Sequence, residues 1–200
     1  DNILISPGQT LTLNGDRTIN DIEIDGTIAV AADVFTVNGN LDIDGTITVT
    51  TGTVDVEGAF DATGGTVTFT GDGDLELAGL VTSLGALTHS DFGTVTYNGG
   101  GAQDIVEDTY VNLIAGGGGG IKSLLGPVVV AGALEIDVGV TVSMGANTLG
   151  VTGASTIDGT LDVAGSTLTV AGASVVGGTI TVSDGTVDAN GTFTAAGGNV

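Results

Sequence analysis

Apolar and polar residues alternate along almost the whole chain. The alternation is clear at residues 22–24 (Ile-Glu-Ile), 41–43 (Leu-Asp-Ile), 54–56 (Val-Asp-Val) and 75–77 (Leu-Glu-Leu). A period of two indicates β-strands with one buried face. The runs are short and are separated by Gly, Asn or Asp, and no stretch combines helical periodicity with helix caps. The pattern therefore predicts an all-β protein.

The strands recur at a fixed spacing. Gly-Thr pairs begin at Gly26, Gly45 and Gly65, spaced nineteen and twenty residues apart. Near the end of the sequence, Gly159 and Gly178 repeat the nineteen-residue step. A period near twenty is typical of solenoid proteins, in which one repeat forms one coil. We therefore predict a parallel β-helix, or β-solenoid, with coils of about 19–21 residues and a right-handed winding, as the crossover rule requires.

A sandwich of β-hairpins is the second interpretation. It would also show alternating strands, but it would not need the same turn at the same offset in each repeat. In a solenoid, the Asp-Gly and Gly-Gly pairs are expected to turn the chain at each corner with a positive φ.

The middle of the chain departs from the period. Residues 98–126 read NGGGAQDIVEDTYVNLIAGGGGGIKSLLG and include five consecutive glycines. A glycine run weakens a strand, so we expect an irregular segment at 98–126. We predict a single solenoid over 1–200 that contains this segment. The alternative is a boundary between two solenoid blocks, 1–97 and 126–200.

Residues 94–137 resemble repeats in very large bacterial surface proteins of the Bacteroidetes type, both adhesin-like and gliding-associated. The resemblance lies in a pattern of the form TYNG-G-AQ … YNL … GGG-K-L-G … V-G-L. The matching residues are Thr96, Tyr97, Asn98, Gly99, Ala102, Gln103, Tyr110, Asn112, Leu113, Lys122, Leu124, Gly126, Gly132 and Leu134. The resemblance implies a secreted protein that acts as a fibre, an adhesin or a surface coat. This chain carries the segment once and shows no C-terminal sorting or anchoring domain, which is consistent with a fragment or with a small subunit that polymerises.

The net charge of the chain limits the kinds of partner that it can bind. The chain has 24 acidic and two basic residues, for a net charge of −22. Such a chain repels nucleic acid and anionic bilayers, and attracts cations. No apolar run is long enough to span a membrane. There is no cysteine, which excludes a disulfide framework and a thiolate zinc site.

Acidic residues also follow the repeat. Several pairs are nineteen residues apart, and in a solenoid such pairs are expected to stack on the outer face. These are Glu23 with Asp42, Asp25 with Asp44, Asp55 with Asp74, and Glu57 with Glu76. Two carboxylates about 5 Å apart in water repel each other by roughly 0.8 kcal/mol. One hypothesis is that calcium bridges these ladders, because hard cations take carboxylate oxygens. The other is a solvated acidic face with no metal.

Threonine ladders are the next repeated feature. Thr46, Thr48 and Thr50 are expected to stack on Thr66, Thr68 and Thr70, and outward Thr-x-Thr arrays resemble the surfaces of some ice-binding proteins. Thr is also simply a good strand residue, and Ala29 and Asp162 interrupt the array.

No catalytic constellation stands out. Arg17 and Lys122 are about five coils apart in the repeat, too far to share a lyase site, and tryptophan platforms for sugars are absent. His89 is the only histidine, and we interpret it as a turn residue beside Ser90 and Asp91. We expect no enzyme.

The first and last coils of an open solenoid leave strand edges unpaired unless they are capped. The sequence shows no amphipathic capping helix and no charged plug at either end. We therefore expect an extracellular or cell-surface structural protein, in a filament or biofilm matrix, whose copies join head to tail. The alternatives are an adhesin module of a larger protein that binds a polysaccharide or cell surface and, less favoured, an ice-binding protein.

Overall fold

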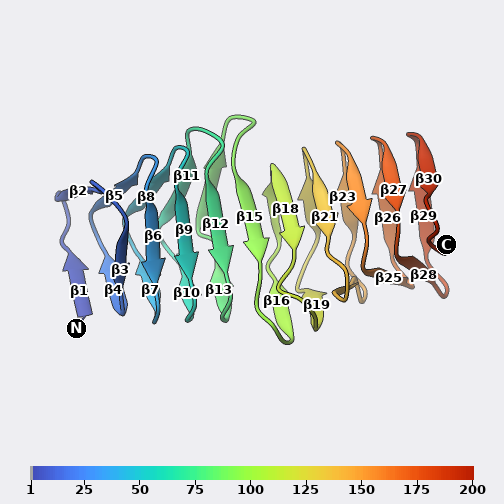
Figure 1. The fold of residues 1–200 in the computed structure, drawn as a ribbon, viewed down its shortest axis with the longest axis horizontal. Helices are drawn as coiled ribbons and strands as arrows, with labels where there is room; N and C mark the ends of the chain where they lie inside the picture. The colour runs from blue at the N-terminus through green and yellow to red at the C-terminus, as the bar shows by residue number, and fades with distance from the viewer. Residues whose placement is uncertain (1) are drawn as a thin grey trace. The chain divides into compact units, whose positions relative to one another are not determined.

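The computed structural model describes residues 2–200, which form strands β1 to β30 joined by turns, with no helix in that range (Figure 1). Most strands pair in parallel with the strand three places further along the chain; β1 pairs with β4, for example, and β4 with β7, whereas β13 and β14 are the last strands of their sheets. Three strands therefore make one coil, and successive coils stack. This arrangement confirms the predicted β-solenoid.

Contacts divide the chain into two compact units, Asp1–Thr96 (unit 1) and Tyr97–Val200 (unit 2). Unit 1 contains three parallel sheets. The first, called here the acidic sheet, contains β1 (Asn2–Ile5), β4 (Asp21–Ile24), β7 (Leu41–Ile43), β10 (Phe60–Asp61) and β13 (Val81–Ser83). The second, called the threonine sheet, contains β2 (Thr10–Thr12), β5 (Thr27–Val30), β8 (Thr46–Val49), β11 (Thr66–Phe69) and β14 (Ala86–His89). The third contains β3 (Arg17–Ile19), β6 (Val34–Val37), β9 (Thr53–Val56) and β12 (Asp74–Leu77). The boundary between the two units falls within β15 (Thr94–Tyr97).

Unit 2 repeats the plan. Its first sheet contains β16 (Gln103–Ile105), β19 (Ile121–Leu124), β22 (Thr141–Ser143), β25 (Thr160–Ala164) and β28 (Thr179–Val182). Its second contains β17 (Asp108–Tyr110), β20 (Val128–Val130), β23 (Leu149–Val151), β26 (Thr167–Val170) and β29 (Thr186–Ala189). Its third contains β18 (Asn112–Ala115), β21 (Leu134–Ile136), β24 (Ser155–Ile157), β27 (Ser174–Val176) and β30 (Phe193–Ala195).

The core consists of rows of identical or similar apolar side chains, one from each coil. In the threonine sheet, Ile28 pairs with Ile47 and Ile47 with Val67, and all three are fully buried. Burying such a side chain is worth about 1.5–3 kcal/mol. Because the inner residue of each strand contacts its equivalent in the next coil, the alternation seen in the sequence becomes a continuous apolar row.

Coil length varies more than the sequence suggested. The register pairs Thr10 with Thr27, seventeen residues on, and Ile22 with Leu41, nineteen residues on. It pairs Val54 with Leu75, twenty-one residues on. The extra residues lie in the turns, so an inserted residue changes which outward side chains become neighbours.

The repeated glycines at the corners have a different role from the one expected. Gly26 and Gly45 are absent from the positions with positive φ, whereas Gly64, in a Gly-Gly pair, has a φ of 88°. At Gly45 an added Cβ would overlap the carbonyl oxygen of Gly26 in the coil before. The Asp-Gly-Thr corners therefore need glycine because stacked backbones approach closely there, and not for a left-handed turn.

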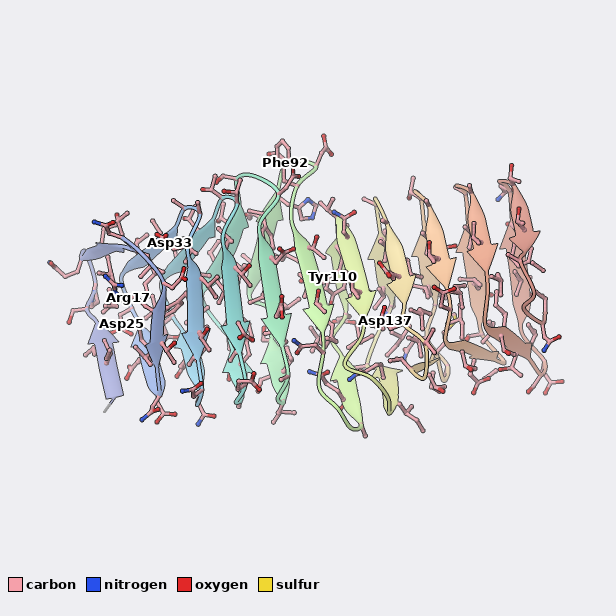
Figure 2. All side chains as sticks on the ribbon, in the orientation of Figure 1. Arg17, Asp25, Asp33, Phe92, Tyr110 and Asp137 are labelled. Atoms are coloured by element: carbon pink, nitrogen blue, oxygen red, sulfur yellow. The ribbon has the colours of Figure 1, made fainter. Side chains whose placement is uncertain are left out.

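Acidic side chains also hold adjacent coils together. The backbone N–H of Val34 donates to Asp16 Oδ1 at 2.9 Å, and that of Gly15 donates to Asp33 Oδ2 at 3.0 Å. These two bonds run in opposite directions between the same pair of turns; Figure 2 labels Asp33 beside this corner. Part of the negative charge of the chain thus has a structural use.

The segment expected to be irregular is mostly ordered into strands. Residues 98–126 contain β16 to β19, and the glycine run forms the turn between β18 and β19, with positive φ at Gly117, Gly118, Gly119 and Gly120. This turn needs glycine, because consecutive positive φ values suit glycine alone. Residues 98–102, before β16, form a second loop in the segment.

Candidate functional site

Three carboxylates stack on the outer face of the acidic sheet. The register places Glu23 beside Asp42 and Asp42 beside Asp61. Neighbouring strands lie about 4.8 Å apart, so the three form one row, and Asp25 and Asp44 follow the same strands at the corner. Asp61 was missed in the sequence, although it lies nineteen residues after Asp42 and could have been found from that spacing.

The carboxyl group of the central residue, Asp42, has a raised pKa. Partial burial raises the pKa of the Asp42 carboxyl, and the nearby charges of Asp44, Asp61 and Asp25 raise it further. A hydrogen bond with the Ile43 backbone acts in the opposite direction. The row therefore carries unrelieved repulsion when all of its carboxyls are ionised.

Two of the expected acidic pairs are wrong. Asp55 does not stack on Asp74, and Glu57 does not stack on Glu76; instead Glu76 pairs with Asp55, and Asp74 pairs with Thr53. The coil between them has twenty-one residues instead of nineteen. This moves Glu57 into the turn after β9, without a stacked acidic partner at that step.

A calcium site stays a prediction. Within residues 2–200, no group of three or more His, Asp or Glu side chains gathers in a way that could enclose a metal ion. The Glu23–Asp42–Asp61 row offers carboxylates along an open face, which suits a loosely held or bridging cation better than an enclosed one.

The threonine sheet presents rows of hydroxyl groups. One row contains Thr10, Thr27, Thr46, Thr66 and Ala86, and the next contains Thr12, Ala29, Thr48, Thr68 and Thr88. Neighbouring hydroxyls bond to each other: Thr68 Oγ1 lies 2.8 Å from Thr88 Oγ1, and Thr50 Oγ1 lies 3.0 Å from Thr70 Oγ1. The expected stacking of residues 46–50 on 66–70 is thus confirmed, as is the interruption at Ala29.

A hollow lies where this sheet ends. It has a volume of about 290 Å³ and is lined by Thr68, Phe69, Thr70, Thr88, His89, Ser90 and Phe92. His89 is the last residue of β14 and pairs with Phe69, so its interpretation as a turn residue is wrong. Phe92 is 39% exposed and lies on the turn before β15 (Figure 2). No periodic signal in the sequence pointed to Phe92, because the turn lies outside the strand pattern.

The two basic residues have structural partners. The guanidinium of Arg17 donates to the carbonyl oxygens of Asp16 and Asn14 on the first coil. Lys122, in unit 2, is fully buried, and its ammonium donates to the carbonyl oxygen of Gly99 and to Gln103 Oε1. Burial lowers the pKa of Lys122. Both basic residues are thus held by backbone carbonyl oxygens, and Lys122 also by a side-chain amide oxygen.

The motif that contains this lysine also contains two buried tyrosines, Tyr97 and Tyr110. Tyr97 Oη lies 2.9 Å from Tyr110 Oη, and Tyr110 donates to the carbonyl oxygen of Val106 at 2.7 Å. Burial raises the pKa of both phenols. The aromatic residues of the motif shared with surface proteins therefore build the interior of unit 2.

Comparisons of the chain with protein-family models, with curated proteins and with solved structures found no match. The described residues contain no helix that could cross a membrane. The solenoid fold follows from the structure, and the likeness to bacterial surface proteins rests on the motif alone.

Proposed function

We propose that this chain is a non-enzymatic structural protein of the extracellular surface, whose copies join head to tail through the ends of the solenoid. The observation that carries the proposal is the exposed apolar row of the first described coil of unit 1. Strands β1 and β2 each have a paired neighbour on one side within the described chain. Their inward residues Ile3 and Leu11 are 39% and 40% exposed.

The end of the core is hollow at this point. An apolar cavity of about 210 Å³ opens among Ile3, Leu11, Leu13, Ile22 and Phe35. Leu13, Ile22 and Phe35 are buried, so the cavity reaches into the core. A further coil stacked on β1 and β2 would fill this space and satisfy the free backbone groups of the edge.

The third strand of this coil, β3, carries a charged residue at an inward position. Arg17 occupies the register position that Phe35 and Val54 hold in the next coils, and its guanidinium folds onto nearby carbonyl oxygens (Figure 2). The sequence showed no charged plug at this end, and the structure places one charged residue, Arg17, at an inward register position of β3. An inward charge on an edge strand discourages unspecific pairing, which leaves β1 and β2 as the strands proposed for stacking.

The other end of the proposed contact is the last coil of a second copy. In unit 2, β29 is the edge strand of its sheet, and β28 meets only the isolated bridge from Thr179 to Asn199 on its outer side; Val182 on β28 is 41% exposed. A contact between two different surfaces of the subunit is heterologous, and it builds a filament when the rotation from copy to copy does not close a ring.

The interior supports a structural and not a catalytic role. Five buried polar side chains are bonded to one another or to the backbone: Lys122 to Gln103, Ser155 Oγ to Ser174 Oγ at 2.8 Å, and Ser166 to the carbonyl oxygen of Val163. Secretion is part of the proposal because residues 94–137 resemble repeats of secreted bacterial surface proteins.

Electron microscopy and sedimentation velocity over a range of concentrations test the proposal, with and without a calcium chelator. We expect filaments that lengthen with concentration. The double variant Ile3→Lys/Leu11→Lys should stop assembly by placing charges in the open end. Thr46→Lys/Thr48→Lys adds the same charge on an outer face and should assemble normally.

A monomer at every concentration would overturn head-to-tail assembly and favour the alternative, a module of a larger surface protein. Loss of filaments on chelation would make the acidic row a metal-dependent part of the assembly, and filaments that persist would make it a solvated face.

A further inference from the structure

The hollow at the end of the threonine sheet has the chemistry of a sugar site. We propose that the groove formed by β11, β14 and the turn 90–93 binds a neutral saccharide. This inference does not depend on the head-to-tail assembly proposed above, because the groove lies on the outer face and edge of the threonine sheet and uses none of the residues of β1 or β2.

The lining combines one aromatic wall with a bed of hydroxyl groups. Phe92 supplies an exposed ring, and Thr68, Thr70, Thr88 and Ser90 supply hydroxyls. A sugar ring has an apolar C–H face and an equatorial rim of hydroxyls. An aromatic ring can pack against the first, and Thr and Ser hydroxyls can bond to the second. A volume of about 290 Å³ is near the lower limit for ligand sites, which suits one or two sugar units.

The hydrogen bonds within the bed leave acceptors for a ligand. Thr88 donates its hydroxyl hydrogen to the carbonyl oxygen of Val67 at 3.3 Å, so Thr68 must be the donor in the 2.8 Å bond between Thr68 and Thr88. Each hydroxyl oxygen has two lone pairs. Thr68 therefore keeps both of its lone pairs and Thr88 keeps one, and a sugar hydroxyl can donate to them.

The turn that carries Phe92 is held in place. Asp91 has a φ of 68°, one of two positive values at non-glycine residues within 2–200, and Gly93 has a φ of 91°. An added Cβ at Gly93 would overlap the ring of buried Phe69, so the turn rests directly on the core. A residue kept in the left-handed region costs free energy and persists where its surroundings fix it. The aromatic wall is thus positioned before any ligand arrives, which reduces the entropy cost of binding.

Charge selects the class of sugar. In a chain with a net charge of −22, none of the residues that line the groove is a carboxylate. Exposed Asp91 stands on the same turn. An acidic saccharide would be repelled by this carboxylate and by the negative field of the whole chain. A neutral saccharide would meet no such repulsion.

Titration calorimetry and amide chemical-shift mapping test the inference, with cellotetraose, laminaritetraose and mannotetraose as neutral probes and digalacturonate as an acidic one. We expect at least one neutral probe to bind with millimolar affinity and to shift the amides of residues 68–70 and 88–93. Phe92→Ala should weaken this binding at least tenfold, and Phe92→Trp should retain it. Thr70→Val, which keeps the shape but removes the hydroxyl, should weaken it several-fold.

Leu80→Ala is the matched control, because Leu80 is 63% exposed on another turn of unit 1 and does not line the groove. It should bind as the wild type does. No binding by any neutral probe at 20-fold above a millimolar Kd (about 20 mM), on the scale that such weak sites need, would overturn the inference. So would binding that is unchanged in Phe92→Ala, or binding of digalacturonate alone.

Discussion

Lys122 and Gln103 face each other from adjacent strands of unit 2, with Nζ of the lysine 3.0 Å from Oε1 of the glutamine. They occupy the same register position on β19 and β16, in a row that elsewhere holds apolar side chains such as Val142. The ammonium also donates to Gly99, in the loop before β16. A buried cation with oxygen acceptors thus ties the loop 98–102 to the next coil.

We predict that Lys122→Met destabilises the protein by about 1–3 kcal/mol. Methionine keeps most of the side-chain volume but leaves the carbonyl oxygen of Gly99 without its donor, and a buried unsatisfied group costs about that much. Urea unfolding measures the change. Ile121→Thr, on the same strand but 52% exposed, should change stability by less than about 0.5 kcal/mol. Equal stability of Lys122→Met and wild type would show that the desolvation of the charge cancels the bonds.

The same lysine should give the stability a pH dependence of known sign. Burial lowers the pKa of Lys122 below its ordinary value of 10.5. Between the lowered pKa and 10.5, the unfolded chain holds more protons than the folded one, so this contribution to stability rises with pH. The stability of wild type relative to Lys122→Met should therefore increase as the pH is raised toward 10.5, and a difference that is constant from pH 7 to 10 would contradict the assignment.

The tyrosine pair should act in the opposite direction at higher pH. Burial raises the pKa of Tyr97 and of Tyr110 above the ordinary value of 10.0. Their contribution is complete below pH 10 and is lost as the pH rises above it, because only the unfolded phenols ionise there. Tyr97→Phe should cost about 1–2 kcal/mol at pH 7 through the lost bond to Tyr110 and should make the alkaline decline less steep. Ultraviolet titration would contradict this if both phenols ionised near pH 10 in the folded protein.

Asp42→Asn should stabilise the protein at neutral pH. The pKa of this carboxyl is raised by partial burial and by neighbouring carboxylates. Its ionisation in the folded state therefore opposes folding as the pH rises through the raised pKa. For exposed charges the gain should be about 0.5–1 kcal/mol at low salt, and it should vanish below pH 3.8, the ordinary pKa. Glu135→Gln is the control, since Glu135 has Ile114 and Thr156 as strand neighbours and no stacked acid; a comparable gain there would point to net charge instead of the row.

Gly45→Ala should be among the most damaging small substitutions. Its Cβ would overlap the backbone of Gly26 in the preceding coil, so two coils would have to separate, at a cost of about 1–3 kcal/mol or more. Gly150→Ala is the matched control: Gly150 lies within β23, has no atom within 4 Å of an added Cβ and no positive φ, so alanine should be neutral there or slightly stabilising. Thermal unfolding of both variants checks the prediction, which fails if the two melt at the same temperature.

The motif shared with surface proteins shows how far sequence patterns reach. Its glycines, tyrosines and lysine stood out as a group, but their spacing did not say what they do. In the structure Lys122 binds Gln103 and Gly99, and Tyr97 binds Tyr110. Lys122 and Gln103 are brought together by the stacking of adjacent coils, and Tyr97 and Tyr110 meet in the buried interior from β15 and β17.

The sequence by itself determined the all-β class, the parallel coils and which residues face the core, because a buried face at period two and a repeat near nineteen residues leave few other solutions. Tertiary structure alone decided which outward side chains are neighbours. Coils of seventeen to twenty-one residues shift the register, so Glu76 meets Asp55 instead of Glu57. The tertiary structure also decided that corner glycines are needed where backbones approach closely. It likewise decided that a turn outside the repeat places Phe92 beside a group of hydroxyls. Turn length and contact between coils depend on the packing of the whole stack, and a local pattern does not encode them.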